Sequence, residues 1–317
     1  MTRSPWPNPL IRYRSDPSVL YHGGQYYFTS SVIEYDRLEL RRASSIKGLS
    51  TAKPVVVWRK HDSGPQSLLI WAPELHNIRD KWYLYFAATG SHEMKGNTLQ
   101  HRMFVLECSD PDPLTGTWVE KGQIKTAIDT FALDSTAFVL QGKLWYVWSQ
   151  KTPNIESNSN IYLSEMENPW TLKGKALMLT KPEYDWERQG YPVTEAPAVM
   201  THGDRLFISY SASATDENYC LGLLWANITA DLLKAESWHK LPQPVFMTSK
   251  ESKQYGPGHN SFTKTPEGED VLIYHARLCN EGEGDPQYCP NRHTRAKLIN
   301  WSEDGMPQFG TPPPDHA

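Results

Sequence analysis

The chain has 317 residues, and its 32 Lys and Arg residues nearly balance its 36 Asp and Glu residues, which leaves a formal net charge of -4. A balance of this kind, without long charge runs, argues against nucleic acid or an anionic membrane surface as a partner. Hydrophobic residues make up 39% of the chain, enough for a buried core. No apolar run approaches the roughly 20 residues that span a bilayer.

Five segments of similar pattern follow one another along the chain. Each opens with a polar or small residue, turns at Gly, Asp or Asn, and closes on an alternating aromatic and β-branched strand. They start near Asp16, Ala72, Asp134, Glu195 and His259, which lie 56 to 64 residues apart. A repeat of this length with two short strands per copy indicates a radial array. We therefore expect an all-β fold, a five-bladed β-propeller, with residues 1–317 forming a single catalytic domain.

Strands are expected where aromatic and β-branched residues alternate between turn residues. In chain order these are residues 25–31, 81–87, 104–108, 144–149, 161–164, 206–211 and 271–275. Alternating leucines and arginines within residues 34–47 favour a strand over a helix. Most of the 12 Trp and 16 Tyr residues are expected to fill the spaces between blades, and a few to serve as platforms for sugar rings. The Pro- and Gly-rich end after Trp301 is expected to fray.

The first strand of each segment is expected to line the central channel, because the innermost strands of a propeller surround its axis. Asp16, Asp134 and Glu195 start the first, third and fourth segments and would meet near that axis. Burying three carboxylates together is unfavourable, so at least one should have a raised pKa. Glu74 and Glu187 fall outside the axial positions and are not expected to be catalysts.

Two carboxyl groups flanking a scissile bond are what glycoside hydrolysis requires. One protonates the leaving oxygen, and the other activates water or attacks the anomeric carbon. Carboxylates on non-adjacent blades are expected to lie far enough apart to admit a water molecule, which is the inverting geometry. A third acid can orient the general acid and raise its pKa. The alternative from a different class is a propeller that binds sugars without cleaving them.

Four motifs give the chain a specific resemblance. They are Ser15-Asp16-Pro17, Trp71-Ala72-Pro73-Glu74, Leu133-Asp134-Ser135 and Thr194-Glu195-Ala196-Pro197. In this order they resemble glycoside hydrolase family 43, whose members are five-bladed propellers that act by inversion. The resemblance implies that Asp16 is the general base, Glu195 the general acid, and Asp134 the residue that tunes the pKa of Glu195 and orients it.

Residues 30–49 and 55–76 resemble the family branch of exo-acting α-L-arabinofuranosidases. This resemblance implies an enzyme that releases L-arabinofuranose from the non-reducing ends of arabinan or arabino-oligosaccharides. An arabinofuranosidase acting on arabinoxylan side chains and a β-xylosidase stay open as alternatives. The sucrose- and fructan-cleaving propellers fit poorly, because this chain lacks their Asn-Asp-Pro-Asn-Gly and Arg-Asp-Pro stretches.

Four further residues are candidates for binding the substrate. Trp71 is expected at the mouth of the channel as a platform for the sugar. Glu34 and Tyr35 are expected in a loop that limits cleavage to chain ends. The resemblance implies that Arg277 reaches the sugar hydroxyls, since a guanidinium presents a fork of hydrogen-bond donors.

The resemblance also implies that His259 faces calcium, another cation or a water cluster beneath the substrate. Calcium prefers oxygen ligands, so mostly water is expected around any such ion. No cofactor is expected to be required.

The four cysteines show no CxxC spacing, so a zinc site is not expected. Whether Cys279 pairs with Cys289 stays open. The first repeat begins by Asp16 without an apolar signal segment before it, so a cytoplasmic location is expected. A secreted protein is the alternative if a signal peptide had been removed.

Overall fold

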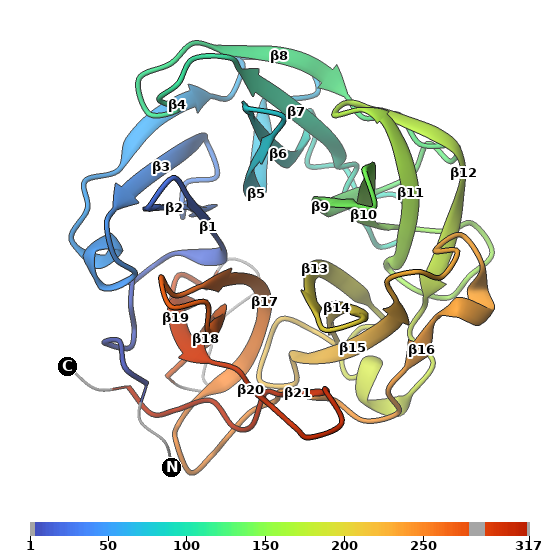
Figure 1. Ribbon diagram of the computed structural model, residues 1–317. Coiled ribbons are helices and arrows are strands. Elements are labelled where there is room, and N and C mark those ends of the chain that lie inside the picture. Colours follow the sequence, from blue (N-terminus) through green and yellow to red (C-terminus); the bar gives the residue numbers. More distant parts are fainter. Residues whose placement is uncertain (1–3, 279–288, 316–317) are drawn as a thin grey trace.

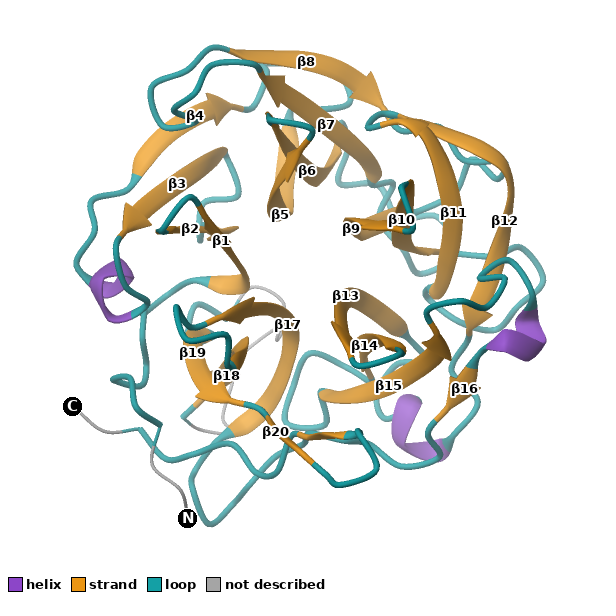
Figure 2. Ribbon diagram, viewed as in Figure 1, coloured by secondary structure: helices purple, strands orange, loops and turns teal. Residues whose placement is uncertain are grey.

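The computed structural model describes residues 4–278 and 289–315, which form five β-sheets around a central axis (Figure 1). Within each of these sheets the strands follow sequence order and pair antiparallel with their neighbours. The first strand of each sheet lies nearest the axis and the later strands lie further out, as Figure 2 shows. The arrangement is the five-bladed β-propeller that the sequence predicts. Cys279, whose pairing with Cys289 the sequence leaves open, lies outside the described residues.

Each blade consists of short strands joined by tight turns or loops. Blade one contains β1 (Ser15–His22), β2 (Gln25–Ser31), β3 (Arg37–Ala43) and β4 (Val55–Arg59). Blade two contains β5 (Leu68–Ile78), β6 (Lys81–Thr89), β7 (Arg102–Cys108) and β8 (Trp118–Gln123). Blade three contains β9 (Ala132–Leu140), β10 (Lys143–Gln150), β11 (Asn160–Asn168) and β12 (Thr171–Thr180). Blade four contains β13 (Thr194–His202), β14 (Arg205–Ala212), β15 (Cys220–Asn227) and β16 (His239–Lys240). Blade five contains β17 (Tyr255–Lys264), β18 (Asp270–Arg277) and β19 (His293–Leu298).

The remaining elements lie outside these sheets. The strands β20 (Asn300–Trp301) and β21 (Pro307–Gln308) pair with each other. The described residues also contain the short 3-10 helices η1 (Lys47–Ser50), η2 (Asp185–Glu187) and η3 (Ala235–Ser237). The strand expected over residues 34–47 is confirmed for its central part, which is β3, while its last residue, Lys47, begins η1.

The N-terminal segment closes the ring by pairing with blade five. The main-chain amide of Leu10 donates to the carbonyl oxygen of Thr294 in β19 at 2.8 Å, and Ile11 forms a β-bridge with the same residue. The Asn8 side chain donates to the carbonyl oxygen of Ala296 at 3.1 Å and accepts from its amide at 3.0 Å. Blade five therefore combines segments from near both ends of the described chain.

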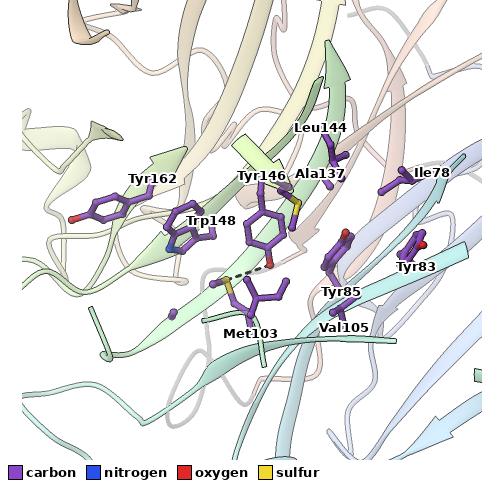
Figure 3. Packing of buried hydrophobic residues seen from close by; sticks show 13 residues of the cluster. Ile78, Tyr83, Tyr85, Met103, Val105, Ala137, Leu144, Tyr146, Trp148 and Tyr162 are labelled. Carbon is purple, nitrogen blue, oxygen red and sulfur yellow. Dashed lines mark hydrogen bonds between the residues drawn. The ribbon is translucent and has the colours of Figure 1, made fainter. Parts of the chain in front are cut away.

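Aromatic side chains fill the space between neighbouring blades, as the sequence predicts. Between blades two and three, Tyr85, Tyr146, Trp148 and Tyr162 belong to one buried cluster (Figure 3). The rings of Tyr85 and Tyr146 lie 5.4 Å apart between centroids, and the Tyr146 hydroxyl lies 3.5 Å from the sulfur of Met103. Burial of a large apolar side chain contributes about 1.5–3 kcal/mol to stability, so such clusters hold the blades in place around the axis.

The C-terminal segment packs against blade five, so the prediction that it frays is wrong for the described residues up to 315. Pro312 and Pro313 are buried. Asp315 pairs with Arg295 of β19, whose side chain is 0% exposed; Nε lies 2.9 Å from Oδ1, and Nη2 lies 3.0 Å from Oδ2. The composition of the tail does not predict this ion pair, because the counter-charge for the buried Arg295 comes from a residue distant in the sequence.

Replacing Asp315 by alanine is expected to lower the free energy of unfolding by about 3 kcal/mol, because it leaves the buried Arg295 charge without its partner. Urea unfolding followed by tryptophan fluorescence measures the change. The matched control is Asp129→Ala, which removes a 2.6 Å ion pair with Arg102 from a carboxylate that is 81% exposed. That control should change stability by less than about 1 kcal/mol. Equal losses in the two variants would contradict the role of the buried pair.

Candidate active site

A cavity of about 960 Å³ lies where the first strands of the five blades meet. Each of these strands contributes at least one residue to its lining. They are Asp16 of β1, Trp71 and Ala72 of β5, Leu133 and Asp134 of β9, Glu195 of β13 and His259 of β17. Residues within 92–99, 151–158, 190–193 and 213–215 supply much of the rest. The cavity is at the upper end of the size range of small-molecule sites, and all three candidate catalytic carboxylates line it.

A β-bulge interrupts each axial strand beside the cavity. At each bulge the pairing with the second strand of the blade shifts, and one residue has a left-handed backbone. These residues are Asp16 (φ 54°), Ala72 (φ 46°), Asp134 (φ 50°), Ala196 (φ 51°) and His259 (φ 42°). Asp and His adopt this conformation more readily than most residues. Bulges redirect side chains and often lie next to active sites, so they explain how regular strands present functional groups at the axis.

The equivalence expected for Glu195 is wrong by one residue. Asp16 and Asp134 are themselves the left-handed residues of their strands, whereas the left-handed residue of β13 is Ala196. Glu195 stands immediately before it. The three carboxylates therefore do not share one position of the repeat, although their side chains line the same cavity.

The strand register gives the correct alignment of blade four. Glu195 pairs with Ser211 across the first two strands, as Trp71 pairs with Ala87 in blade two. Glu195 is thus equivalent to Trp71. An Ala-Pro dipeptide follows both residues in the sequence, and aligning the two dipeptides would have given this register.

The Asp16 carboxylate lies among basic side chains. Its Oδ1 is 3.3 Å from His259 Nδ1, and 3.4 Å from both His275 Nδ1 and Arg292 Nη1. Burial alone would raise the pKa of Asp16, but these neighbours and a hydrogen bond with Ser31 hold it well below its usual range. Asp16 is therefore ionised at neutral pH.

Arg292 is the neighbour that brings a full positive charge to Asp16. Burial lowers the pKa of His259 and lowers the pKa of His275 well below its usual value, so both rings are neutral at pH 7. The Asp16 amide donates to His275 Nδ1 at 3.1 Å, which requires this nitrogen to carry no proton. Arg292 therefore supplies the full charge that favours the Asp16 carboxylate.

Glu195 differs from Asp16, because a raised pKa leaves it partly protonated at neutral pH. Burial raises the pKa of Glu195 to about 7. A 2.7 Å hydrogen bond from the Tyr219 hydroxyl to Oε1 opposes this rise, the charge of Asp16 adds to it, and Arg292 opposes it. A carboxyl group with a pKa near 7 carries a proton in much of the population at neutral pH, as a general acid must.

Asp134 is the third buried carboxyl group, and its pKa depends on both Asp16 and Glu195. Burial raises the pKa of Asp134 well above its usual value, and the charges of Glu195 and Asp16 raise it further, although the Ala196 amide donates to its carboxylate. Two of the three carboxyl groups thus have raised pKa values, in line with their burial together. Because Ala196 follows Glu195, the same hydrogen bond ties Asp134 to the backbone that carries Glu195.

His259, which the sequence predicts to lie beneath the substrate near a cation or a water cluster, contacts two carboxylates in the structure. Its Nδ1 is 3.3 Å from Asp16 Oδ1 and 4.0 Å from Asp134 Oδ2, and its amide donates to Ser211 Oγ at 2.8 Å. Within residues 4–278 and 289–315, no three or more His, Cys, Asp and Glu side chains are grouped so that they could hold a metal ion.

Trp71 and Tyr35 line the cavity. The Trp71 indole stacks on the buried ring of His101, with centroids 3.8 Å apart and planes 14° apart. The Tyr35 ring meets Trp71 edge-on at 6.1 Å, and its hydroxyl accepts a 3.2 Å hydrogen bond from Arg292 Nη2. Both rings are placed to contact a ligand, and their binding roles stay predictions.

Glu34 and Arg277 are not brought to the cavity, so the structure gives no support to their predicted roles in binding. The turn that directs Tyr35 inward directs Glu34 outward, where its side chain is 58% exposed and pairs with Arg37 at 3.1 Å. Arg277 ends β18, the second strand from the axis, and is 5% exposed without lining the cavity in the described part of the chain.

Arg292 takes the place that the sequence assigned to Arg277. It is 6% exposed, lines the cavity and reaches Asp16 and Tyr35 through its two terminal nitrogens. It directly precedes β19, whose sequence HTRAKL lacks an alternating apolar pattern, so no strand was expected there. Tyr219 was also missed, because it precedes β15 in a loop without a recognisable motif.

Glu74 and Glu187 have structural partners, in line with the expectation that neither is a catalyst. Glu74 lies 2.9 Å from His76 Nε2. Glu187 is 0% exposed, accepts a 2.7 Å hydrogen bond from Tyr210 and pairs with Lys240 at 2.8 Å. Neither residue lines the cavity within the described residues.

Comparison with known proteins identifies the family. Residues 6–307 match the family model for glycosyl hydrolases family 43, and the chain belongs to this family. An extracellular exo-α-(1→5)-L-arabinofuranosidase of Streptomyces avermitilis is 48% identical over 97% of the chain. The chain spans 64% of that protein's length. A protein of the same name from Streptomyces chartreusis is 48% identical over 89% of the chain and 86% of its own length.

A solved structure gives the same picture of the fold. The crystal structure of an α-L-arabinofuranosidase from Lactobacillus brevis has a TM-score of 0.98 to this chain at 52% identity, with 100% of both chains covered.

The expected location is not supported by these comparisons. Both Streptomyces relatives are named extracellular, whereas the sequence favoured a cytoplasmic protein. In the residues that the structure describes, there is no helix with the length and apolar character needed to cross a membrane.

Proposed function

We propose that this chain is an inverting glycoside hydrolase that releases L-arabinofuranose from the non-reducing ends of arabinan or arabino-oligosaccharides. The observation that carries the proposal is that one cavity holds an ionised carboxylate, Asp16, and a carboxyl group that titrates near pH 7, Glu195. These are the two protonation states that glycoside hydrolysis needs at the same pH. The substrate class is supported by the names of the arabinofuranosidases to which the chain is similar.

Glu195 acts as the general acid. Its carboxyl proton passes to the glycosidic oxygen as the bond between that oxygen and the anomeric carbon breaks. The sugar gains oxocarbenium character, and the leaving alcohol departs neutral. Burial keeps Glu195 protonated until this point, because it raises the pKa to about 7.

Asp16 acts as the general base on the opposite face of the sugar. It accepts a proton from the water molecule whose oxygen bonds to the anomeric carbon, and the configuration at that carbon inverts. Arg292 keeps Asp16 ionised, and Arg292 and His259 both lie against its Oδ1 before the reaction. Solvent then removes the proton from Asp16 and returns one to Glu195.

Asp134 sets the pKa of Glu195 in this scheme. Asp134→Asn removes a carboxyl group that is coupled to Glu195, in a pair where the charge of each raises the pKa of the other, so Glu195 should lose its proton more easily and the basic limb of the pH–rate profile should move to lower pH. Activity at the optimum should also fall, since the change alters the acceptor of the Ala196 amide, which ties Asp134 to the backbone that carries Glu195. The profile of kcat/KM between pH 4 and 9 measures both effects. A basic limb at its wild-type position would remove the tuning role.

The substrate assignment is tested with two aryl glycosides. Release of p-nitrophenol from the α-L-arabinofuranoside, with little from the β-D-xyloside, is the expected result. A preference for the xyloside would replace the substrate class with that of a β-xylosidase. Activity on arabinoxylan without activity on arabinan would assign the enzyme to side chains. Binding of arabino-oligosaccharides without any turnover would support a non-catalytic sugar-binding propeller.

We also propose that the enzyme acts outside the cell, because two relatives carry that description. Activity found in the culture medium of the native host, and not in its washed cells, would support this location. The reverse distribution would contradict it.

A further inference from the structure

We propose that Tyr219 is a positioning residue that holds the Glu195 carboxyl group in place from a slot formed by Gly258 and His275. The inference rests on the proposed function in one respect, the assignment of Glu195 as general acid. The other observations that support it are the contacts of Tyr219, which belongs to no recognised motif.

Tyr219 is fixed on both its polar and its apolar sides. It is 1% exposed, and its hydroxyl donates to Glu195 Oε1 at 2.7 Å. Its ring lies parallel to that of His275, with planes 2° apart and centroids 5.7 Å apart. A buried phenol held this way fixes the direction of its hydroxyl, so the carboxyl group that accepts from it is also fixed.

Gly258 provides the space for the ring. A Cβ atom built on Gly258 would overlap Cδ1 and Cε1 of Tyr219. The backbone of Gly258 does not have a positive φ, so its conformation does not demand glycine. The close approach of the Tyr219 ring is therefore the physical reason for glycine at this position.

The same ring stack connects the acid to the base. His275, on which Tyr219 lies, accepts the Asp16 amide through Nδ1 at 3.1 Å. Tyr219 thus contacts Glu195 of blade four at one end and lies against the residue that anchors Asp16 of blade one. This arrangement fixes the two carboxyl groups relative to each other across the axis, which is what a reaction between two opposed groups requires.

Four groups act on the charge of Glu195 or respond to it. The charge of Asp16 raises the pKa of Glu195, and Arg292 lowers it. The charge of Glu195 in turn raises the pKa of Asp134. Tyr219 is the direct hydrogen-bond donor, and its bond favours the ionised form. Removal of the hydroxyl should therefore raise the pKa of Glu195, in the opposite direction to Asp134→Asn.

The first test is Tyr219→Phe, which keeps the ring in its slot and removes only the donor. We expect the basic limb of the kcat/KM profile to move up by about one pH unit. We also expect kcat to fall by about tenfold at the optimum on arabino-oligosaccharides. The loss should be smaller on the p-nitrophenyl glycoside, which has a good leaving group and needs the acid less.

Tyr210→Phe is the matched control. Tyr210 is also buried in blade four, donates to a glutamate (Glu187) at 2.7 Å, and has its ring against a glycine (Gly222) that has no room for a Cβ. It does not line the cavity. A structural role predicts that this variant loses stability without moving the basic limb. A similar shift in both variants would overturn the special role of Tyr219.

Gly258→Ala is the second variant, because it displaces the ring without changing the hydroxyl. It should move the basic limb in the same direction as Tyr219→Phe and lower kcat. A basic limb at the wild-type pH in both Tyr219→Phe and Gly258→Ala would overturn the proposal.

A titration that does not depend on activity separates this proposal from the proposed function. The chain is labelled with carbon-13 at the glutamate carboxyl carbons, and Glu195→Gln identifies the signal of Glu195. The midpoint of that signal should be higher in Tyr219→Phe than in the wild type, even if no substrate is turned over. An unchanged midpoint would overturn the hydrogen bond's role. A shifted midpoint without hydrolysis of any arabinofuranoside would retain the contact and reject the function.

Discussion

Replacement of Glu195 by glutamine is expected to lower turnover of arabino-oligosaccharides by about 10²- to 10⁴-fold, the range that general acid catalysis contributes. Glutamine keeps the size of the side chain and still accepts the Tyr219 hydrogen bond, but it has no proton to give to the leaving oxygen. Initial rates of arabinose release from arabinotriose, measured with folded protein, provide the comparison.

The leaving group makes this prediction specific to the acid. The p-nitrophenyl glycoside should lose less activity than arabinotriose in Glu195→Gln, because its leaving group departs with little protonation. Glu74→Gln is the matched control, since Glu74 is a partly buried glutamate on an axial strand that pairs with His76. It should keep its turnover within about tenfold. Equal losses on both substrates, or an active Glu195→Gln variant, would contradict the acid assignment.

Replacement of Asp16 by asparagine is expected to have an effect of similar size, about 10²- to 10⁴-fold, on both kinds of substrate. Asparagine tolerates the left-handed backbone at this position (φ 54°), so the bulge should survive. It has no charge with which to take a proton from water. Water activation is needed whatever the leaving group, so turnover of the oligosaccharide and of the aryl glycoside should fall by similar factors.

The comparison of the two variants separates the roles. A leaving-group dependence in Glu195→Gln and its absence in Asp16→Asn is the expected pattern. An Asp16→Asn variant that recovers on the aryl glycoside would contradict its role as base. Circular dichroism spectra identical to that of the wild type would exclude unfolding as the cause of either loss.

The sequence repeat was sufficient to predict most of the fold and part of the active site. Asp16 and Asp134 were found because each begins a copy of the repeat, and in the structure both are the bulged residues of axial strands. Glu195 was found with an incorrect register, because Glu195 resembles the acidic starts of other copies more than Ala196 does. The register is set by backbone pairing with β14, which a comparison of residue types did not include.

The remaining parts of the site depend on contacts between distant segments. Arg292 and Tyr219 meet Asp16 and Glu195 only through ring closure and the packing of loops, so no local periodicity pointed to them. Arg277 was the more obvious choice, because it ends an apolar strand that the sequence predicts well. Sequence patterns thus identified the residues placed by the repeat, and missed residues whose positions come from tertiary packing.

The central claim is that Asp16 and Glu195 cleave a terminal arabinofuranoside with inversion. It is tested most directly by following the digestion of linear α-1,5-arabinan by proton NMR from the first minutes. We predict arabinose as the first and only small product, appearing as the β-anomer before mutarotation produces the α-anomer. Initial release of the α-anomer would contradict the inverting pair, and a ladder of oligosaccharides would contradict cleavage from chain ends.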